Sequence, residues 1–482
     1  MTVLARTLTV ALLASLLWPG SEARACYAVV VGREASADGS VLVGHNEQNG
    51  GRRLLNFRRI PRRTFPEGAT VELGRGGRLA QVAETWAFLW SENPGIEFSD
   101  GYLNEWGVAV VSDGCPTRED SYDTLVARGE IRQGGIGYML RRLVAERARS
   151  AREGVELGGR LVEQFGYVQS GRTYVIADPN EAWLLEVVCG RRWVAQRVPD
   201  DAVVVLPNVH IIDEVDLADD KNFLGSPDLV EYAVRRGWFD PEAGEAFNFR
   251  RVYTGSPGVP PDPRRLRGRQ LVAGLAEPEP ADRPLKFGIK PAEKMTVAAV
   301  VAILRDTGGA RPLCTPTTQE GAVFQLRSRL PREIGCIYWR TTAAPCTSVL
   351  LPWYLGITET PPEFFRPVEI DEHVSLEHHF RPPQGTFDPD PRLAWWTFKS
   401  LQDAVLEDAP NRIGVARAAW DTLEKRLLEE QPAVEQEALQ LWQTDRDAAR
   451  RLLTEYCTGV AGRAVDEARI LTERLAGAHA AP

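Results

Sequence analysis

Short apolar runs separated by turn residues dominate the first half of the chain, a pattern typical of buried β-strands. The first two runs flank Ala37-Asp38-Gly39, so we expect a hairpin around this turn. Both runs are nearly continuous in apolar residues, which indicates a sheet covered on both faces. The expected strands cover residues 27–31, 40–45, 108–112, 173–177, 183–188, 193–198, 203–206, 334–340 and 347–351.

Helical spacing of apolar residues occurs between these strands and again at the C-terminal end. Strands, then helices, then strands again fit two sheets packed face to face with helices outside. From residue 392 to about 476 we expect two to four helices, broken by Pro410 and Pro432. The earlier expected helices cover residues 138–148, 154–165 and 296–305.

Two proline-rich stretches, residues 254–292 and 361–391, divide the chain. Stretches of this composition are typical of long loops or domain boundaries. The expected organisation is a leader at 1–25, a main domain at 26–390 that contains the 254–292 loop or boundary, and a helical C-terminal region at 391–482.

Residues 1–25 have the pattern of a secretory signal peptide. Arg6 precedes a short apolar core at 8–17, and Ala23-Arg24-Ala25 forms an A-x-A cleavage site. The core is shorter than the roughly 20 residues that span a bilayer, and no later stretch is apolar enough to do so. We therefore expect a secreted or periplasmic protein without a membrane span.

The formal net charge of −9 is evenly mixed along the chain, which argues against nucleic acid and anionic membranes as partners. The chain has seven cysteines, and an exported protein can form disulfides, but the sequence does not choose among the pairings. No C-x-x-C pair occurs, so zinc-ribbon and thioredoxin chemistry are not indicated. Cys457 lies on a helical stripe with Leu453 and Val460 and is expected to be a buried free thiol.

Cys26 follows the predicted cleavage site directly and begins the first strand. Cleavage after Ala25 would give Cys26 a thiol and a free α-amino group on one residue, that is, a nucleophile and a candidate base. The reference pKa values are about 7.7–8.0 for the amine and about 8.5 for the thiol, so proton transfer between them is feasible near neutral pH. This arrangement indicates an N-terminal-nucleophile hydrolase, although most cysteines of exported proteins are structural.

Four further residues are candidates for the same site. Asn208 ends an apolar strand and Asn104 lies in a strand-connecting turn, so their amides could stabilise an oxyanion. Asparagine is also common in turns for purely structural reasons. His45 and Glu47 are expected to follow the second strand of the first hairpin, whose geometry can bring them near Cys26; His45 could instead be a core imidazole.

His373, His378 and His379 cluster among acidic residues, as metal ligands often do. Prolines bound this run and the H-E-x-x-H spacing is missing, so a solvated loop is the favoured interpretation. The sequence also lacks a P-loop, a G-x-S-x-G elbow and a dinucleotide-binding fingerprint. We therefore expect no metal and no other cofactor.

Six stretches carry a family likeness: CYAVVVGREASADGSVLVGHNE, LNEWGVAVVSDGC, ERARSAREGVELGGRLVEQFG, YVIADPNEAWLLEV, WVAQRVPDDAVVVLPN and LRSRLPREIGCIYWRTTAAPCTSVLLPWYLGI. In order and spacing the sequence resembles the cysteine dipeptidase family of the N-terminal-nucleophile hydrolases, which includes the secernins. The resemblance implies an α+β fold, a four-layer αββα sandwich, here followed by a C-terminal helical appendage. It also implies hydrolysis of dipeptides without a metal.

The sequence is more distantly similar to bile-salt hydrolases and penicillin V acylases. Their pattern has an arginine and, three residues later, an aspartate that helps to hold the amine of the nucleophile; this chain has His45 and Gln48 there. Either Glu47 substitutes, or the site is tuned differently, or activity is weak. The resemblance assigns the asparagine of the family's N-E-x-G motif to Asn104 and its strand-end asparagine to Asn208.

The sequence thus predicts an exported cysteine dipeptidase that cleaves small peptide substrates through a Cys26 thioester. One alternative keeps this site but acts on N-acyl amides, or transfers the acyl group to an amine. Another alternative is a disulfide-bonded binding protein whose Cys26 is structural or lipidated.

Overall fold

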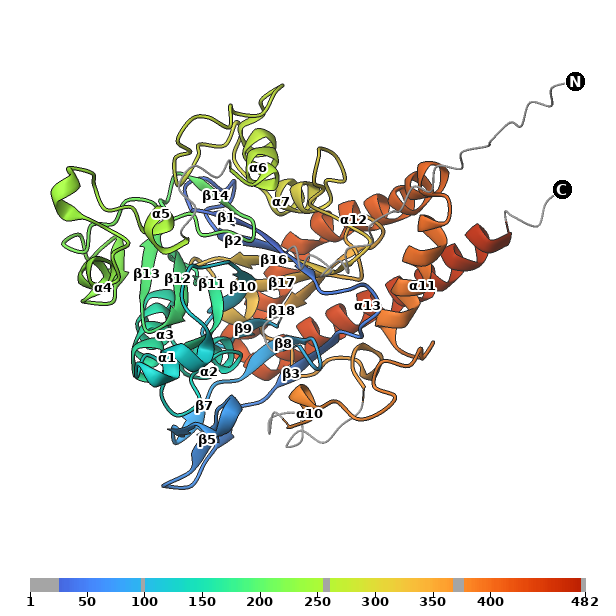
Figure 1. The fold of residues 1–482 in the computed structure, drawn as a ribbon. Helices are drawn as coiled ribbons and strands as arrows, with labels where there is room; N and C mark the ends of the chain where they lie inside the picture. Colours follow the sequence, from blue (N-terminus) through green and yellow to red (C-terminus); the bar gives the residue numbers. More distant parts are fainter. Residues whose placement is uncertain (1–25, 97–99, 255–260, 367–376, 478–482) are drawn as a thin grey trace, which may run out of the picture.

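The computed structural model describes residues 26–96, 100–254, 261–366 and 377–477. Within them, two large antiparallel sheets form the centre of the molecule (Figure 1). The six-stranded sheet has the order β14 (Val203–Leu206), β1 (Tyr27–Val31), β2 (Val41–Gln48), β16 (Thr318–Leu326), β17 (Cys336–Thr342), β18 (Leu350–Tyr354). The eight-stranded sheet has the order β15 (Phe223–Gly225), β13 (Trp193–Arg197), β12 (Ala182–Gly190), β11 (Tyr167–Ala177), β10 (Ala109–Gly114), β9 (Gly101–Asn104), β8 (Phe88–Glu92), β3 (Asn56–Ile60).

The side chains of β11 show why its apolar run is continuous. Val175 and Ala177 belong to the core between the two sheets, whereas Tyr174 and Ile176 belong to the core under the outer helices. Successive side chains of a strand point to opposite faces, so a strand covered on both sides needs apolar residues at every position. The prediction of sheets covered on both faces is therefore confirmed.

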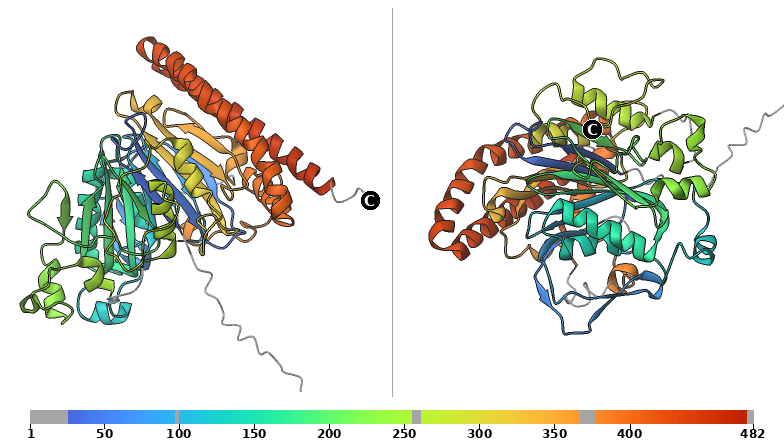
Figure 2. Two further views of the ribbon diagram at one scale, coloured as in Figure 1. Left: turned by 90° about the horizontal axis from the view of Figure 1, so that it is seen from above. Right: turned by 90° about the vertical axis from the view of Figure 1, so that its left-hand side faces the viewer.

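Helices cover the outer face of each sheet (Figures 1 and 2). On the eight-stranded sheet, α2 (Met139–Arg147) and α3 (Ala151–Phe165) pack over β9 to β13. On the six-stranded sheet, α6 (Pro263–Ala273) lies over β14 and α7 (Val297–Leu304) over β2 and β16. The structure thus has the four αββα layers that the resemblance implied. Shorter helices of the periphery are α1 (Tyr122–Ala127), α4 (Leu229–Arg235), α5 (Phe249–Thr254), α8 (Arg332–Gly335) and α10 (Glu377–Phe380). Two small two-stranded sheets pair β4 (Arg63–Thr64) with β7 (Glu84–Thr85) and β5 (Thr70–Glu72) with β6 (Arg78–Ala80).

Three C-terminal helices, α11 (Ala394–Leu406), α12 (Ala409–Thr444) and α13 (Arg446–Gly477), complete the outer layer over β17 and β18. Figure 2 shows α12 and α13 as a long pair along one side of the molecule. Their buried residues, among them Trp420 and Leu427, join the same core as Tyr27 of β1, so these helices are continuous with the main domain.

The expectation that Pro432 breaks a helix is wrong, because α12 runs through it. A proline inside a helix removes one backbone hydrogen bond. Here the helix is held on both sides of Pro432 by the buried residues Leu427, Gln431 and Ala438. Pro410 lies in the first turn of α12, where a missing N–H costs nothing.

Among the described helices, none combines the length and apolar character needed to cross a bilayer.

The proline-rich stretch 254–292 contains a helix that the sequence analysis did not predict. α6 begins at Pro263, and the side chain of Asp262 accepts a hydrogen bond from the backbone N–H of Arg264. Proline is favoured at the first helical position and aspartate at the position before it, so Asp262-Pro263 is a start signal rather than a loop signal. This helix carries a residue of the candidate site, described below.

Candidate active site

Cys26 lies immediately before β1, a central strand of the six-stranded sheet that is flanked by β14 and β2. Only 6% of its surface is exposed. Its thiol donates a hydrogen bond to Oε1 of Glu47 at 2.9 Å. The candidate nucleophile is therefore a buried thiol held by a carboxyl group from the neighbouring strand.

The second strand of the hairpin is longer than predicted, so His45 and Glu47 lie within β2 and not after it. Side chains of β2 alternate between two faces. Asn46 and Gln48 point away from the thiol and donate to the carbonyl oxygen of Leu313 at 2.8 and 2.9 Å. Gln48 therefore does not face the Cys26 thiol, and Glu47 is the acidic group of β2 that contacts it.

Glu47 is 4% exposed, and its Oε1 also accepts a hydrogen bond from the Asn49 amide. Burial raises the pKa of Glu47, which outweighs the opposing effect of the nearby His45 charge. A carboxyl group with a raised pKa exchanges protons closer to neutral pH than an ordinary one. Glu47 can thus both orient the thiol and take part in proton movement.

His45 faces Asp113 of β10 in the other sheet, with 3.6 Å between Nε2 and Oδ1. Burial lowers the pKa of His45, but the Asp113 carboxylate, and then Glu47, favour the charged form more strongly, and the net pKa is raised. Among the described residues, neither His45 Nε2 nor the Asp113 oxygens have a hydrogen-bond partner within normal distance. Nε2 of His45 and the two Asp113 oxygens are thus polar atoms near the Cys26 thiol without a hydrogen bond to the described residues.

This pair predicts a pH-dependent stability. A histidine whose pKa is raised on folding stabilises the fold fully below its unfolded pKa, about 6.5, and loses this contribution as pH rises through the folded pKa. The free energy of unfolding should therefore fall as the pH rises above about 6.5, by about 1.4 kcal/mol in total per unit of pKa shift. Denaturant titrations should show a flatter profile for His45→Gln. Part of the remaining slope should come from His379, whose pKa is also raised because Asp100 and Glu92 outweigh burial. An unchanged slope in His45→Gln would contradict the pairing with Asp113.

Burial is the main cause of a pKa of Cys26 well above its ordinary value, and the charges of Glu47 and Asp113 raise it further. A thiol in these surroundings is protonated at neutral pH, while the reactive form of a cysteine is the thiolate. Activation therefore requires a base or a positive charge next to the sulfur.

Asn208 is placed next to Cys26 by the strand pairing and by an arginine. β1 pairs Ala28 with Leu206 of β14, and continuing this register by two residues sets Asn208 opposite Cys26. Arg264 donates to the carbonyl oxygen of Cys26 at 3.2 Å and to Oδ1 of Asn208 at 3.1 Å. Because the guanidinium can only donate, it fixes the orientation of this amide. The Asn208 NH₂ group has no acceptor among the described residues.

A glycine allows α6 to pack close to the strand that follows Cys26. A Cβ on Gly268 would lie 1.7 Å from Oη of Tyr27, so only glycine permits this approach of the helix to β1. Arg264 is four residues earlier and therefore on the same helix face. The close packing at Gly268 thus delivers the Arg264 guanidinium to Cys26.

The structure does not bring Asn104 to this site. Its Nδ2 donates to the carbonyl oxygens of Ala145 and Ala148 at 2.9 and 2.8 Å, and its Oδ1 accepts from two backbone N–H groups of its own turn. Asn104 lies opposite Val108, five residues along β10 from Asp113, which is roughly 16 Å. We therefore assign its amide to the turn and to the end of α2, and correct the expected oxyanion role.

Two buried arginines contact Ser112, the residue next to Asp113. Arg141 of α2 and Arg172 of β11 each donate to Oγ of Ser112 at 3.1 Å. The positive charge of Arg141 lowers the pKa of Glu47, against the raising effect of burial. The Arg141 charge thus partly compensates the buried Glu47 carboxyl.

Cys26, His45 and Asp113 also form a set of potential metal ligands, with one donor atom of each within 4.8 Å of the others. Sulfur, imidazole nitrogen and carboxylate oxygen are all zinc ligands.

The histidine cluster predicted as a solvated loop differs: His373 lies outside the described residues, as does the side chain of His378. His379 is buried rather than solvated, contacting Glu92 Oε1 at 3.2 Å and the Ile96 carbonyl oxygen at 3.1 Å.

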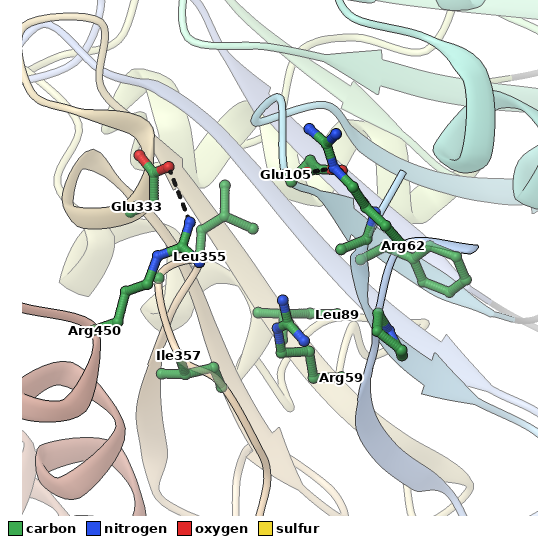
Figure 3. A pocket seen from close by; sticks show the side chains of 12 residues that line it. Arg59, Arg62, Leu89, Glu105, Glu333, Leu355, Ile357 and Arg450 are labelled. Carbon is green, nitrogen blue, oxygen red and sulfur yellow. Dashed lines mark hydrogen bonds and ion pairs between the residues drawn. The ribbon is translucent and has the colours of Figure 1, made fainter. Parts of the chain in front are cut away.

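A cavity of about 400 Å³ lies elsewhere, between β3, the end of β18 and α13 (Figure 3). Arg450 pairs with Glu333 at 3.6 Å on one side and Arg62 pairs with Glu105 at 2.7 Å on the other. Leu355, which follows β18, also lines it. The strand register connects this end of β18 to the start of β2, opposite the end that carries Glu47, so the cavity is separate from Cys26.

Comparisons with known proteins agree with the resemblance seen in the sequence. A probable dipeptidase of Salmonella dublin is 28% identical over 363 residues, covering 70% of this chain and 82% of the relative. Dipeptidase A of Lactobacillus helveticus is 24% identical over 371 residues, covering 70% and 76%. Among solved structures, penicillin V acylase from Agrobacterium tumefaciens matches with 14% identity and a TM-score of 0.34, covering 68% of this chain and 86% of that chain.

A conjugated bile acid hydrolase from Clostridium perfringens, in a mutant form, also matches, with 14% identity and a TM-score of 0.32 over 66% of this chain and 89% of that chain.

The family model for peptidase family C69 matches residues 25–380, which is 356 of the 482 residues. This chain therefore belongs to peptidase family C69 and is a hydrolase.

Proposed function

We propose that this chain is an exported dipeptidase whose nucleophile is the thiol of Cys26, exposed when residues 1–25 are removed. The observation that carries the proposal is the position of Cys26, which follows an A-x-A site and whose buried sulfur lies 2.9 Å from Glu47. The names of the relatives, probable dipeptidase and Dipeptidase A, support the substrate class.

In the proposed first step, the freed α-amine of Cys26 takes the thiol proton. This supplies the base that a thiol with a raised pKa requires. In this proposal the Glu47 carboxyl, which contacts the thiol of the same residue, holds the resulting ammonium and offsets its charge. His45 and Asp113 extend this polar cluster into the second sheet.

In the proposed second step, the thiolate attacks the carbonyl carbon of the peptide bond and negative charge develops on the carbonyl oxygen. The Asn208 amide, oriented by Arg264, donates to this oxygen. The ammonium returns its proton to the leaving amine, which leaves a thioester on Cys26. Water then adds to the thioester and releases the acid and the free thiol.

A purified, leader-free enzyme should hydrolyse dipeptides faster than N-acyl amides when both are assayed side by side. Alkylation of thiols should destroy this activity, because the reacting atom is the Cys26 sulfur. Chelators should leave it unchanged, because the amine, and not a metal, activates the nucleophile. The matched control is alkylation in the presence of a saturating dipeptide, which should protect the activity.

Two outcomes would redirect the proposal. Loss of activity with a chelator, restored by added zinc, would assign the chemistry to a metal at Cys26, His45 and Asp113, or at the histidines near residue 379. Faster turnover of N-acyl amides, or transfer to an added amine, would keep the site and change the substrate class.

A further inference from the structure

Cys314 and Cys346 lie next to each other in the fold although they come from different connections. Cys314 lies between α7 and β16, and Cys346 lies between β17 and β18. Their sulfur atoms are 2.7 Å apart, and the residues are 2% and 8% exposed. With Ala344 they form a small cluster of their own. A disulfide has an S–S distance near 2.05 Å, so the sulfurs need to approach by only about 0.7 Å.

We propose that Cys314 and Cys346 form a disulfide in the mature protein. In the structure Cys314 and Cys346 are drawn as free thiols, as are the other five cysteines. Within the described residues no second pair of sulfurs contacts: Cys26 contacts Glu47, and Cys115 contacts Thr173. The geometry therefore selects one pairing out of the many that the sequence left open, and it leaves Cys26 out of the bond.

The electrostatics of the pair indicate which sulfur reacts first. The pKa of Cys346 is lowered, chiefly because its sulfur accepts a hydrogen bond from the Cys314 thiol, and Arg305 and Arg417 add to the effect. A thiolate is the attacking species in disulfide exchange. The Cys346 thiolate attacks a protein or small-molecule disulfide and releases one thiol. Cys314 then loses its proton, attacks the mixed disulfide at Cys346 and releases the second thiol, so two protons and two electrons leave the pair.

The Cys314 end of this bond lies next to a residue that holds β2 in place. Leu313, next to Cys314, accepts from Asn46 and Gln48 through its carbonyl oxygen. These two residues alternate with His45 and Glu47 along β2, so the segment at Cys314 fixes the rear face of the strand that holds the nucleophile's partners.

The other end adjoins the contacts between the sheet and the C-terminal helices. The carbonyl oxygen of Pro345 accepts from Arg305, which follows α7, and the carbonyl oxygen of Thr347 accepts from Nε1 of Trp420 in α12. The bond would therefore link two segments. One contacts the side of β2 that carries Asn46 and Gln48, and the other is the loop that contacts α12. Its effect is on the stability of this arrangement rather than on the chemistry at Cys26.

Counting thiols tests the proposal directly. The protein is produced with its leader in a host with an oxidising export compartment, purified without reductant, denatured and alkylated. Seven cysteines less the two in the bond leave five, so mass spectrometry should show five alkylated thiols, and seven after reduction. Proteolysis without reduction should give one joined peptide pair that contains Cys314 and Cys346. Seven alkylated thiols without reduction, or a bond between any other two cysteines, would overturn the proposal.

Stability provides a second readout that does not depend on activity. The two cysteines are 32 positions apart, and closing a loop of that size should raise the melting temperature by about 5 °C. A reductant should therefore lower the melting temperature of the wild type but not that of Cys346→Ser. Cys189→Ser, which removes a buried cysteine far from the pair, should keep both the crosslink and the response to reductant. An equal response of Cys346→Ser to reductant would also overturn the proposal.

Discussion

Replacing Cys26 with alanine is expected to abolish peptide hydrolysis while the protein stays folded. The substitution removes the sulfur that the proposed mechanism uses and leaves the strand pairing of β1 unchanged. Loss of a nucleophile in such sites lowers kcat by several orders of magnitude, roughly 10⁴-fold or more. Cys26→Ser should retain a trace of activity, because an alcohol is a poorer nucleophile at neutral pH. Steady-state kinetics on a dipeptide, with a thermal melt of each variant, measures both effects.

Cys457→Ala is the matched control for this substitution. Cys457 is as buried as Cys26 but lies in α13, within the helical core. Its replacement should leave kcat near the wild-type value and lower only the melting temperature. If Cys26→Ala keeps most of its activity, another residue performs the chemistry and the site described here is not the active site.

Replacing Asn208 with alanine is expected to lower kcat by roughly 100- to 1,000-fold, the usual cost of losing one oxyanion donor. KM should change much less, because the hydrogen bond forms chiefly in the transition state. Arg264 donates to Oδ1 of Asn208, and among the described residues the NH₂ group has no acceptor, as the proposed role requires. Kinetics over a range of dipeptide concentrations separates kcat from KM.

Asn104→Ala provides the contrast. The Asn104 amide satisfies the carbonyl oxygens of Ala145 and Ala148, so its loss leaves buried acceptors unpaired and should destabilise the fold by about 1–3 kcal/mol. Activity per folded molecule should remain near wild type. The reverse pattern, with Asn104→Ala impaired in kcat and Asn208→Ala only in stability, would exchange the two assignments.

Local sequence signals were sufficient for the first hairpin and for part of the site. The turn at Ala37-Asp38-Gly39 pairs β1 with β2, and this pairing sets Glu47 against Cys26. Periodicity placed α2 and α3 to within a few residues, and continuous apolar runs correctly indicated strands buried on both faces. These features depend on residues that are close together in the sequence.

The rest of the site depends on contacts between distant segments, which a single sequence does not specify. Asp113 reaches His45 from the other sheet, and Arg264 reaches Cys26 across 238 positions of sequence. The signal for Arg264 was present in Asp262-Pro263, a helix start that the surrounding prolines concealed. Asn104 is the converse case, since its motif predicts a catalytic asparagine whereas its Oδ1 accepts from backbone N–H groups of its own turn.

The most direct test of the account is the N-terminus of the active enzyme. Protein purified from the exported fraction with full dipeptidase activity is analysed by intact mass and by Edman degradation. The account predicts that the chain begins at Cys26, with an unblocked α-amine and residues 1–25 removed. Fully active enzyme that retains residues before Cys26, or whose Cys26 amine is blocked, would contradict the mechanism, because the proposed base would not exist.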